Sequence, residues 1–158
     1  MKNKTILNII LLISIFALSS AYFIEYVLGY KPCNLCLIER LPYFIVILFI
    51  LVGLIINKLE KIILLILGLI FLASTILSFY HFGIEQGFFN ESLVCISNNE
   101  INNLNKDELI KELQKKIVSC KDVQFALLGL SLATLNTIIS FILSVITFRL
   151  FLNYEKNK

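Results

Sequence analysis

The sequence has few charged residues: 16% of its 158 residues are Asp, Glu, Lys or Arg, whereas 58% are hydrophobic. An average soluble domain is about 25% charged and roughly 45–50% apolar. The shortage of charge therefore excludes an ordinary soluble domain, and the high apolar content excludes intrinsic disorder. The net charge of +3 is too small and too scattered to indicate a nucleic-acid-binding protein.

Motifs of several cofactor enzymes are also missing. The chain has one histidine, so it lacks a pair of histidines to hold a haem. It has no flavin motif, no glycine-rich phosphate loop, no internal repeat and no low-complexity segment. The four cysteines remain as the main candidates for chemistry.

What the sequence does contain is four long runs without a charged residue, at 5–24, 41–57, 62–84 and 123–148. A membrane-spanning helix needs about 20 mostly apolar residues, with a range of roughly 17–25. Within lipid every backbone N–H and C=O must be satisfied inside its own segment, so the runs are predicted to be helices. We predict an all-α membrane protein. It is a four-transmembrane-helix bundle in one domain, 1–158, with spans at about 5–28, 41–57, 62–84 and 125–149.

The first run has an alternative interpretation as a cleaved signal peptide. Lys2 and Lys4 precede it, and small residues at 17–21 resemble a cleavage site. The run is nevertheless long for the apolar region of a signal peptide, and cleavage would leave only three spans. We therefore interpret it as a span.

Short basic segments indicate which way the chain crosses the membrane. They lie at the N-terminus, between the second and third runs, and at the C-terminus: Lys2, Lys4, Lys58, Lys61, Arg149, Lys156 and Lys158. By the positive-inside rule these segments, and with them both termini, are predicted to be cytoplasmic. Residues 29–40 and 85–124 then form two outer loops.

The long outer loop is predicted to carry a short amphipathic helix. Asn105 can cap a helix that starts at Lys106, with Glu108 in the third position of a capping box. Apolar residues at 109, 110, 113 and 117 share one face. We expect this helix to lie on the bilayer surface or on the bundle.

All four cysteines fall in the two outer loops. Cys33 and Cys36 lie in the first loop, and Cys95 and Cys120 lie in the second. With four spans these loops share one side of the membrane, and disulfides persist outside the cytoplasm. The C-x-x-C spacing fits a redox pair, a pair of static disulfides or a metal site. We predict no metal site, because the second pair is widely spaced and has no histidine near it in the sequence.

Neighbouring residues favour the redox interpretation. Cys36 is predicted to lie at the start of the second helix, where backbone N–H groups favour an anion, and Arg40 follows about one turn later. Both effects would lower the pKa of the Cys36 thiol. Arg40 alone could equally be a residue at the membrane interface. Since Pro42 cannot donate a backbone hydrogen bond, the regular helix is expected to begin near Leu41.

His81, near the outer end of the third span, is an ionisable group at the depth of the cysteines. Such a group is either functional or an interfacial residue bonded to backbone or water. A thiol pair that gives up electrons needs an acceptor, and an acceptor that resides in the bilayer is a quinone. A cation near its oxygens would stabilise the reduced form. The residues thus indicate a membrane thiol oxidoreductase that is linked to a quinone.

Two segments resemble a known family. Residues 32–40, Pro-Cys-Asn-Leu-Cys-Leu-Ile-Glu-Arg, resemble the P-C-x-L-C-x-x-[EQ]-R signature of the DsbB family of disulfide bond formation proteins. Residues 80–87, Tyr-His-Phe-Gly-Ile-Glu-Gln-Gly, resemble the Y-H-x-G-x-E-x-G segment of one branch of that family. The four spans and both outer cysteine pairs also match, so the resemblance covers essentially the whole chain.

The resemblance implies a protein-disulfide:quinone oxidoreductase that reoxidises a DsbA-like periplasmic partner. By analogy, Cys95 of the Cys95–Cys120 disulfide forms a mixed disulfide with the partner, and electrons then pass to Cys33 and Cys36. Cys36 would face the quinone, Arg40 would hold it, and Glu39 and His81 would lie nearby.

The family also implies a multi-pass protein of the bacterial inner membrane, with its active site on the periplasmic face. Its acceptor would be ubiquinone or menaquinone from the quinone pool of the respiratory chain. Two alternatives stay open at this point. One is a vitamin K epoxide reductase-like redox protein, and the other is a membrane scaffold with static disulfides.

Overall fold

The computed structural model describes residues 4–55, 60–90, 95, 119–121, 123, 125–127 and 129–156. In these residues the chain forms four long helices, one short helix and one short hairpin. In chain order the elements are α1 Lys4–Tyr26, α2 Asn34–Ile38, α3 Leu41–Ile55, α4 Glu60–Glu85, β1 Ala126–Leu127, β2 Leu130–Ser131 and α6 Leu132–Lys156.

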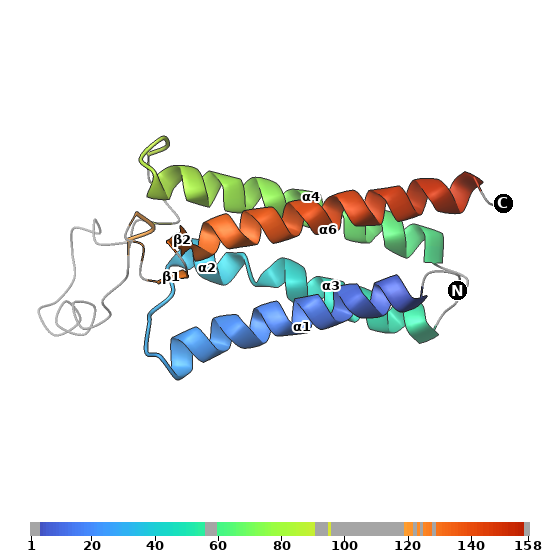
Figure 1. The fold of residues 1–158 in the computed structure, drawn as a ribbon, viewed down its shortest axis with the longest axis horizontal. Helices are drawn as coiled ribbons and strands as arrows, with labels where there is room; N and C mark the ends of the chain where they lie inside the picture. Colours follow the sequence, from blue (N-terminus) through green and yellow to red (C-terminus); the bar gives the residue numbers. More distant parts are fainter. Residues whose placement is uncertain are drawn as a thin grey trace, which may run out of the picture.

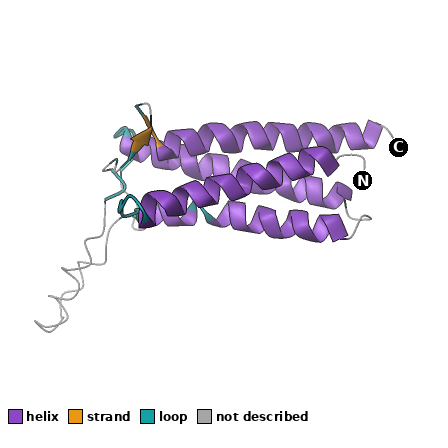
Figure 2. Cartoon of the chain, turned by 60° about the horizontal axis from the view of Figure 1, so that its bottom comes forward, coloured by secondary structure: helices purple, strands orange, loops and turns teal. Residues whose placement is uncertain are grey.

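The long helices form an elongated bundle, as predicted. In Figure 1, α4 runs beside α6 and α1 runs beside α3, with both chain termini at one end. Figure 2 shows the hairpin and the loops before α2 at the opposite end. Four segments are long and apolar enough to cross a membrane: Thr5–Tyr26, Asn34–Ile55, Lys61–Glu85 and Leu132–Asn153. The second of these joins α2 to α3.

Packing between the helices is apolar at the centre of the bundle. Val46 and Ile50 of α3 and Leu64, Leu67 and Phe71 of α4 are fully buried there. Many large apolar side chains elsewhere on the helices are exposed, which fits helices whose outer faces meet lipid. Buried hydroxyl groups supplement this packing, since Ser140 on α6 bonds both Ser74 on α4 and Tyr43 on α3.

The fourth span, predicted at about 125–149, starts later than predicted. The strands β1 and β2 pair as an antiparallel hairpin in which Ala126 lies opposite Ser131, and the helix begins only at Leu132 and continues to Lys156. Gly129 in the hairpin turn has a φ of 83°, a left-handed conformation that glycine adopts without strain. A short apolar run does not distinguish a strand from a helix by its hydropathy, which explains the error.

The outer end of α4 is closed by a glycine. Gly87 has a φ of 78°, its N–H donates to the Ile84 carbonyl, and the Phe88 N–H donates to the Gly83 carbonyl. These two bonds form a Schellman motif, which ends the helix at Glu85. The end of α4 therefore holds His81 and Glu85 one turn apart at the outer end of the bundle. The amphipathic helix predicted after Asn105 lies outside the described residues.

Candidate active site at the outer end of the bundle

Cys33 caps the short helix α2 through its sulfur atom. Its backbone is extended, with a φ of −74° and a ψ of 168°, and its Sγ accepts a hydrogen bond from the Cys36 N–H at 3.2 Å. This is the usual geometry of an N-cap side chain, which satisfies an N–H that has no partner within the helix. The prediction that the helix start would favour a Cys36 thiolate was therefore wrong, because the N–H of Cys36 points to the sulfur of Cys33.

Between α2 and α3 the helix is interrupted at Glu39 and Arg40. The C-cap of α2 is Glu39, and α3 starts at Leu41, one residue before Pro42. The expectation from Pro42 is confirmed, since proline fits the first turn of a helix but not its interior. At this interruption the Glu39 side chain is buried, whereas the Arg40 side chain bonds Glu25 on α1.

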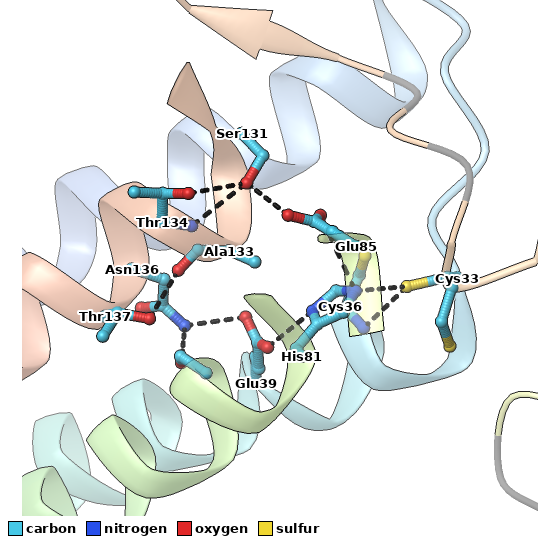
Figure 3. A network of polar contacts seen from close by, with 12 residues as sticks. Cys33, Cys36, Glu39, His81, Glu85, Ser131, Ala133, Thr134, Asn136 and Thr137 are labelled. Carbon is cyan, nitrogen blue, oxygen red and sulfur yellow. Dashed lines mark hydrogen bonds and ion pairs between the residues drawn. The ribbon is translucent and has the colours of Figure 1, made fainter. Parts of the chain in front are cut away.

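His81 links this segment to α4. The residue is 2% exposed, its Nδ1 lies 2.7 Å from Glu39 Oε1, and its Nε2 lies 3.5 Å from Cys33 Sγ. Figure 3 shows the imidazole between the Glu39 carboxylate and the Cys33 sulfur. When both partners are anions, both ring nitrogens donate, which is the arrangement of an imidazolium between two negative charges.

Glu39 is held in turn by α6. Asn136 Nδ2 donates to Glu39 Oε2 at 2.8 Å and to Ser78 Oγ at 2.7 Å, and Asn136 Oδ1 accepts from the Tyr43 hydroxyl at 2.5 Å. Each polar atom of this buried group thus has a partner, as buried polar groups require. Among the described residues no buried side-chain nitrogen or oxygen lacks a hydrogen bond.

These contacts change the acidity of the Cys33 thiol. The hydrogen bond from the Cys36 side chain, followed by the hydrogen bond and charge of His81, lowers the pKa of Cys33 from 9.0 to about 5, although burial acts in the opposite direction. A thiol with this pKa is a thiolate at neutral pH, and the thiolate is the form that attacks disulfides.

Glu85 lies near the ring nitrogen of His81 that also faces Cys33. Its Oε1 is 3.9 Å from His81 Nε2, and its Oε2 accepts a hydrogen bond from the Ser131 hydroxyl. Ser131 also caps α6, because its Oγ accepts from the Thr134 N–H at 3.2 Å. Ser131, the last residue of the hairpin, therefore connects the start of α6 to the end of α4 (Figure 3).

Arg40 makes its ion pair with α1. Its Nη1 lies 2.5 Å from Glu25 Oε2, and its guanidinium carbon lies 4.9 Å from the centre of the Tyr22 ring. Both side chains of the ion pair are partly buried, 12% exposed for Arg40 and 22% for Glu25. From the sequence, Arg40 was expected to be a partner for the thiolate or a quinone or a residue at the membrane interface, and its pairing with Glu25 was not predicted.

The second cysteine pair is a disulfide. Cys95 and Cys120 are bonded with their Cα atoms 5.6 Å apart, whereas Cys33 and Cys36 are free thiols. Cys33, Cys95 and Cys120 belong to one buried cluster with Leu35 and Ile84, and Cys36 packs against that cluster. The fold thus brings a disulfide and a dithiol together from two loops.

The structure brings together most of the residues predicted from the sequence. The His81 imidazole contacts both Cys33 and Glu39. Arg40 instead pairs with Glu25 on α1. The roles of Asn136, Ser131 and Glu85 were not predicted from the sequence. A signal for Asn136 was present, because an amide inside an otherwise apolar span usually has a hydrogen-bonding role.

Comparisons with known proteins identify a family and a relative for nearly the whole chain. Residues 3–150 match the family model described as disulfide bond formation protein DsbB. The chain is also 37% identical over 155 residues to the uncharacterized protein RP370 of Rickettsia prowazekii (strain Madrid E), and the match covers 96% of this chain and 90% of the relative.

Proposed function

Because the chain belongs to the DsbB family of disulfide bond formation proteins, we propose that this multi-pass membrane thiol oxidoreductase is a protein-disulfide:quinone oxidoreductase. Its proposed task is to reoxidise a DsbA-like thiol partner at the periplasmic face of a bacterial inner membrane. One observation carries the proposal. A dithiol with a stabilised thiolate lies in the same buried cluster as a disulfide, at one end of a membrane-spanning bundle.

The first proposed step reduces the Cys95–Cys120 disulfide. A thiolate of the partner attacks Cys95, forms a mixed disulfide and releases Cys120 as a thiolate. The second thiolate of the partner then attacks its own mixed-disulfide sulfur and releases Cys95. The partner leaves with a disulfide, and Cys95 and Cys120 carry the two electrons that it lost.

The second proposed step moves these electrons to Cys33 and Cys36. One thiolate of the reduced outer pair attacks the Cys33–Cys36 disulfide, and its neighbour then closes the Cys95–Cys120 disulfide again. The cluster that holds Cys33, Cys95 and Cys120 supports a direct exchange. The described arrangement, with Cys95–Cys120 oxidised and Cys33 and Cys36 as thiols, corresponds to the state after this step.

In that state His81 and Glu39 stabilise the charge on Cys33. The imidazole donates to the sulfur through Nε2, and the carboxylate orients the ring and balances its charge through Nδ1. Asn136 positions the carboxylate from α6. We therefore assign His81 and Glu39 to the thiolate of Cys33 rather than to the quinone.

The residues around Cys36 fit a quinone. Cys36 is less buried than Cys33, and its neighbours Leu37, Ile38 and Leu41 expose apolar side chains on the lipid-facing surface. A bound quinone would accept two electrons and two protons from the dithiol. Cys36 would face it, and Arg40, which donates to Glu25 through Nη1, would donate to a quinone oxygen through its other N–H groups.

Trapping the partner tests this proposal. In a Cys120→Ser variant Cys95 is a lone thiol whose thiolate attacks the disulfide of the oxidised partner, and no Cys120 is present to displace the partner from the mixed disulfide, so we expect a covalent complex with a thioredoxin-like protein on a non-reducing gel. A matched Cys95→Ser variant should give no such complex. Static disulfides would give none in either variant, and would also stay oxidised in a glutathione redox titration.

A further inference from the structure

The two free thiols and His81 form a compact group of three ligand atoms. Cys33 Sγ, Cys36 Sγ and a ring nitrogen of His81 all lie within 4.8 Å of one another. They come from the start of α2 and the outer end of α4, so that Cys33 and His81 are 48 residues apart in the chain. Thiolate and imidazole are ligands that Zn²⁺ favours.

The distance between Cys33 and His81 already fits a tetrahedral zinc ion. Zn–S bonds of about 2.3 Å and Zn–N bonds of about 2.0 Å separate a sulfur and a nitrogen ligand by roughly 3.5 Å in a tetrahedron. Cys33 Sγ lies 3.5 Å from His81 Nε2. The separation of these two atoms therefore already fits ligands that share one zinc ion.

His81 also has the surroundings of a metal ligand. A metal-bound histidine usually donates its other ring N–H to a carboxylate, which fixes the tautomer and the ring orientation. Here Nδ1 faces Glu39 at 2.7 Å, and Asn136 holds the other carboxylate oxygen. Glu85 offers a fourth ligand, because its Oε1 lies 3.9 Å from His81 Nε2 and its side chain is buried.

We propose that reduced Cys33 and Cys36 form, with His81 and Glu85, a binding site for Zn²⁺ that holds the dithiol in its reduced state. On binding, the S–H of Cys36 and the Nε2–H of His81 each lose a proton, Cys33 binds as the thiolate it already is, and two zinc–sulfur bonds and one zinc–nitrogen bond form without electron transfer. Sulfur atoms that are bound to zinc are not available to form a disulfide, so the ion would inhibit turnover. The inhibition rests on the proposed function, whereas the binding site does not.

Metal binding is measured on the full chain after both cysteines of the disulfide, Cys95 and Cys120, have been replaced by serine. In a Cys95→Ser, Cys120→Ser protein the remaining cysteines are Cys33 and Cys36, and Co²⁺ alone serves as a coloured substitute for Zn²⁺. For the reduced protein we expect one Co²⁺ per chain, with thiolate-to-cobalt absorption that Zn²⁺ removes by displacement. The same protein with a Cys33–Cys36 disulfide should show no such absorption.

Two substitutions separate this site from weaker surface binding. Glu39→Gln should weaken Zn²⁺ binding about 10–100-fold, as loss of a partner to a metal-bound histidine usually does. Glu25→Gln removes a carboxylate at the same end of the bundle that pairs with Arg40, and should leave the affinity unchanged. Equal effects of the two substitutions would overturn the assignment.

Alkylation of the wild-type protein tests the site without any substitution, so misfolding of a variant cannot affect the result. Zn²⁺ should protect Cys33 and Cys36 from alkylation in the reduced wild-type protein, as located by mass spectrometry. Absence of both protection and cobalt absorption would refute the metal site and leave the oxidoreductase proposal intact. Conversely, metal binding by a protein that never passes electrons to a quinone would refute the proposed function alone.

Discussion

The imidazole of His81 and the carboxylate of Glu39 form a buried pair, with Nδ1 2.7 Å from Oε1. The two residues come from α4 and from the interruption between α2 and α3, 42 positions apart in the chain. Their pairing directs the other ring nitrogen of His81 to the Cys33 sulfur. The negative charge of the proposed dithiol is therefore stabilised on Cys33, the cysteine that caps α2.

The acidity of Cys33 should be visible in a pH titration. In a reduced Cys95→Ser, Cys120→Ser protein freed of metal by a chelator, the ultraviolet absorbance of the Cys33 thiolate should persist at neutral pH. It should disappear as the pH falls through about 5. Cys36→Ala and His81→Gln should each raise the pKa of Cys33, because the hydrogen bond from the Cys36 side chain is its largest single lowering cause and His81 contributes a hydrogen bond and a charge. A midpoint near the ordinary value of 9.0 before any further substitution would contradict the structure.

Asn136 should matter for stability more than its neighbour Thr137. Asn136→Leu would remove the hydrogen bond to Glu39 Oε2 and would leave the Tyr43 hydroxyl with Ser140 alone, at a cost of about 1–3 kcal/mol in the free energy of unfolding. Thr137 bonds only to the Ala133 carbonyl of its own helix in the described contacts, so Thr137→Val should cost less. Unfolding in a mixed-detergent titration compares the two, and equal losses would argue against a special role for Asn136.

Arg40 and Glu25 should affect the quinone in opposite directions. Arg40→Ala should raise the apparent KM for a water-soluble quinone analogue about tenfold or more, since a charge-assisted hydrogen bond is worth roughly 1.5–3 kcal/mol. Glu25→Gln removes the anion that neutralises Arg40 and should lower this KM up to about fivefold, given the modest energy of a partly exposed ion pair.

The control for these two variants is Arg149→Ala, an exposed arginine near the other end of α6, which should leave the KM for the quinone unchanged. Each variant should also leave the KM for the protein partner unchanged. A change confined to the KM for the partner would remove Arg40 from the proposed quinone site.

Gly87 should be the sensitive residue at the outer end of α4. Its φ of 78° is left-handed, and such a conformation costs an alanine roughly 1–2 kcal/mol. Gly87→Ala should therefore lower the free energy of unfolding by about 1 kcal/mol, and Gly87→Asn by less, because asparagine tolerates this conformation better. Similar losses for both substitutions would show that the backbone conformation is not the cause.

Several features of the molecule followed from local sequence alone. Runs of apolar residues long enough to cross a bilayer can satisfy their backbone only as helices, so the number and approximate places of the spans were predictable. Pro42 placed the start of α3 because proline lacks an N–H. With four spans, both cysteine pairs are expected at one end of the bundle, and the structure places Cys33, Cys95 and Cys120 in one buried cluster with Cys36 packed against it.

Other features depended on tertiary structure because they join residues that are distant in the chain. Hydropathy did not show that β1 and β2 form a hairpin, since an apolar strand and an apolar helix have similar composition. Nor did it show that Arg40 pairs with Glu25 or that Asn136 holds Glu39.

The sequence by itself determined that four spans carry two outer cysteine pairs, because burial of backbone in lipid is a local requirement of each segment. Only the tertiary structure decided that Cys33, and not Cys36, receives the helix N–H and the imidazole. The physical reason is that the acidity of a thiol depends on the donors around its sulfur atom, and these come from α2 and α4 only once the bundle has formed.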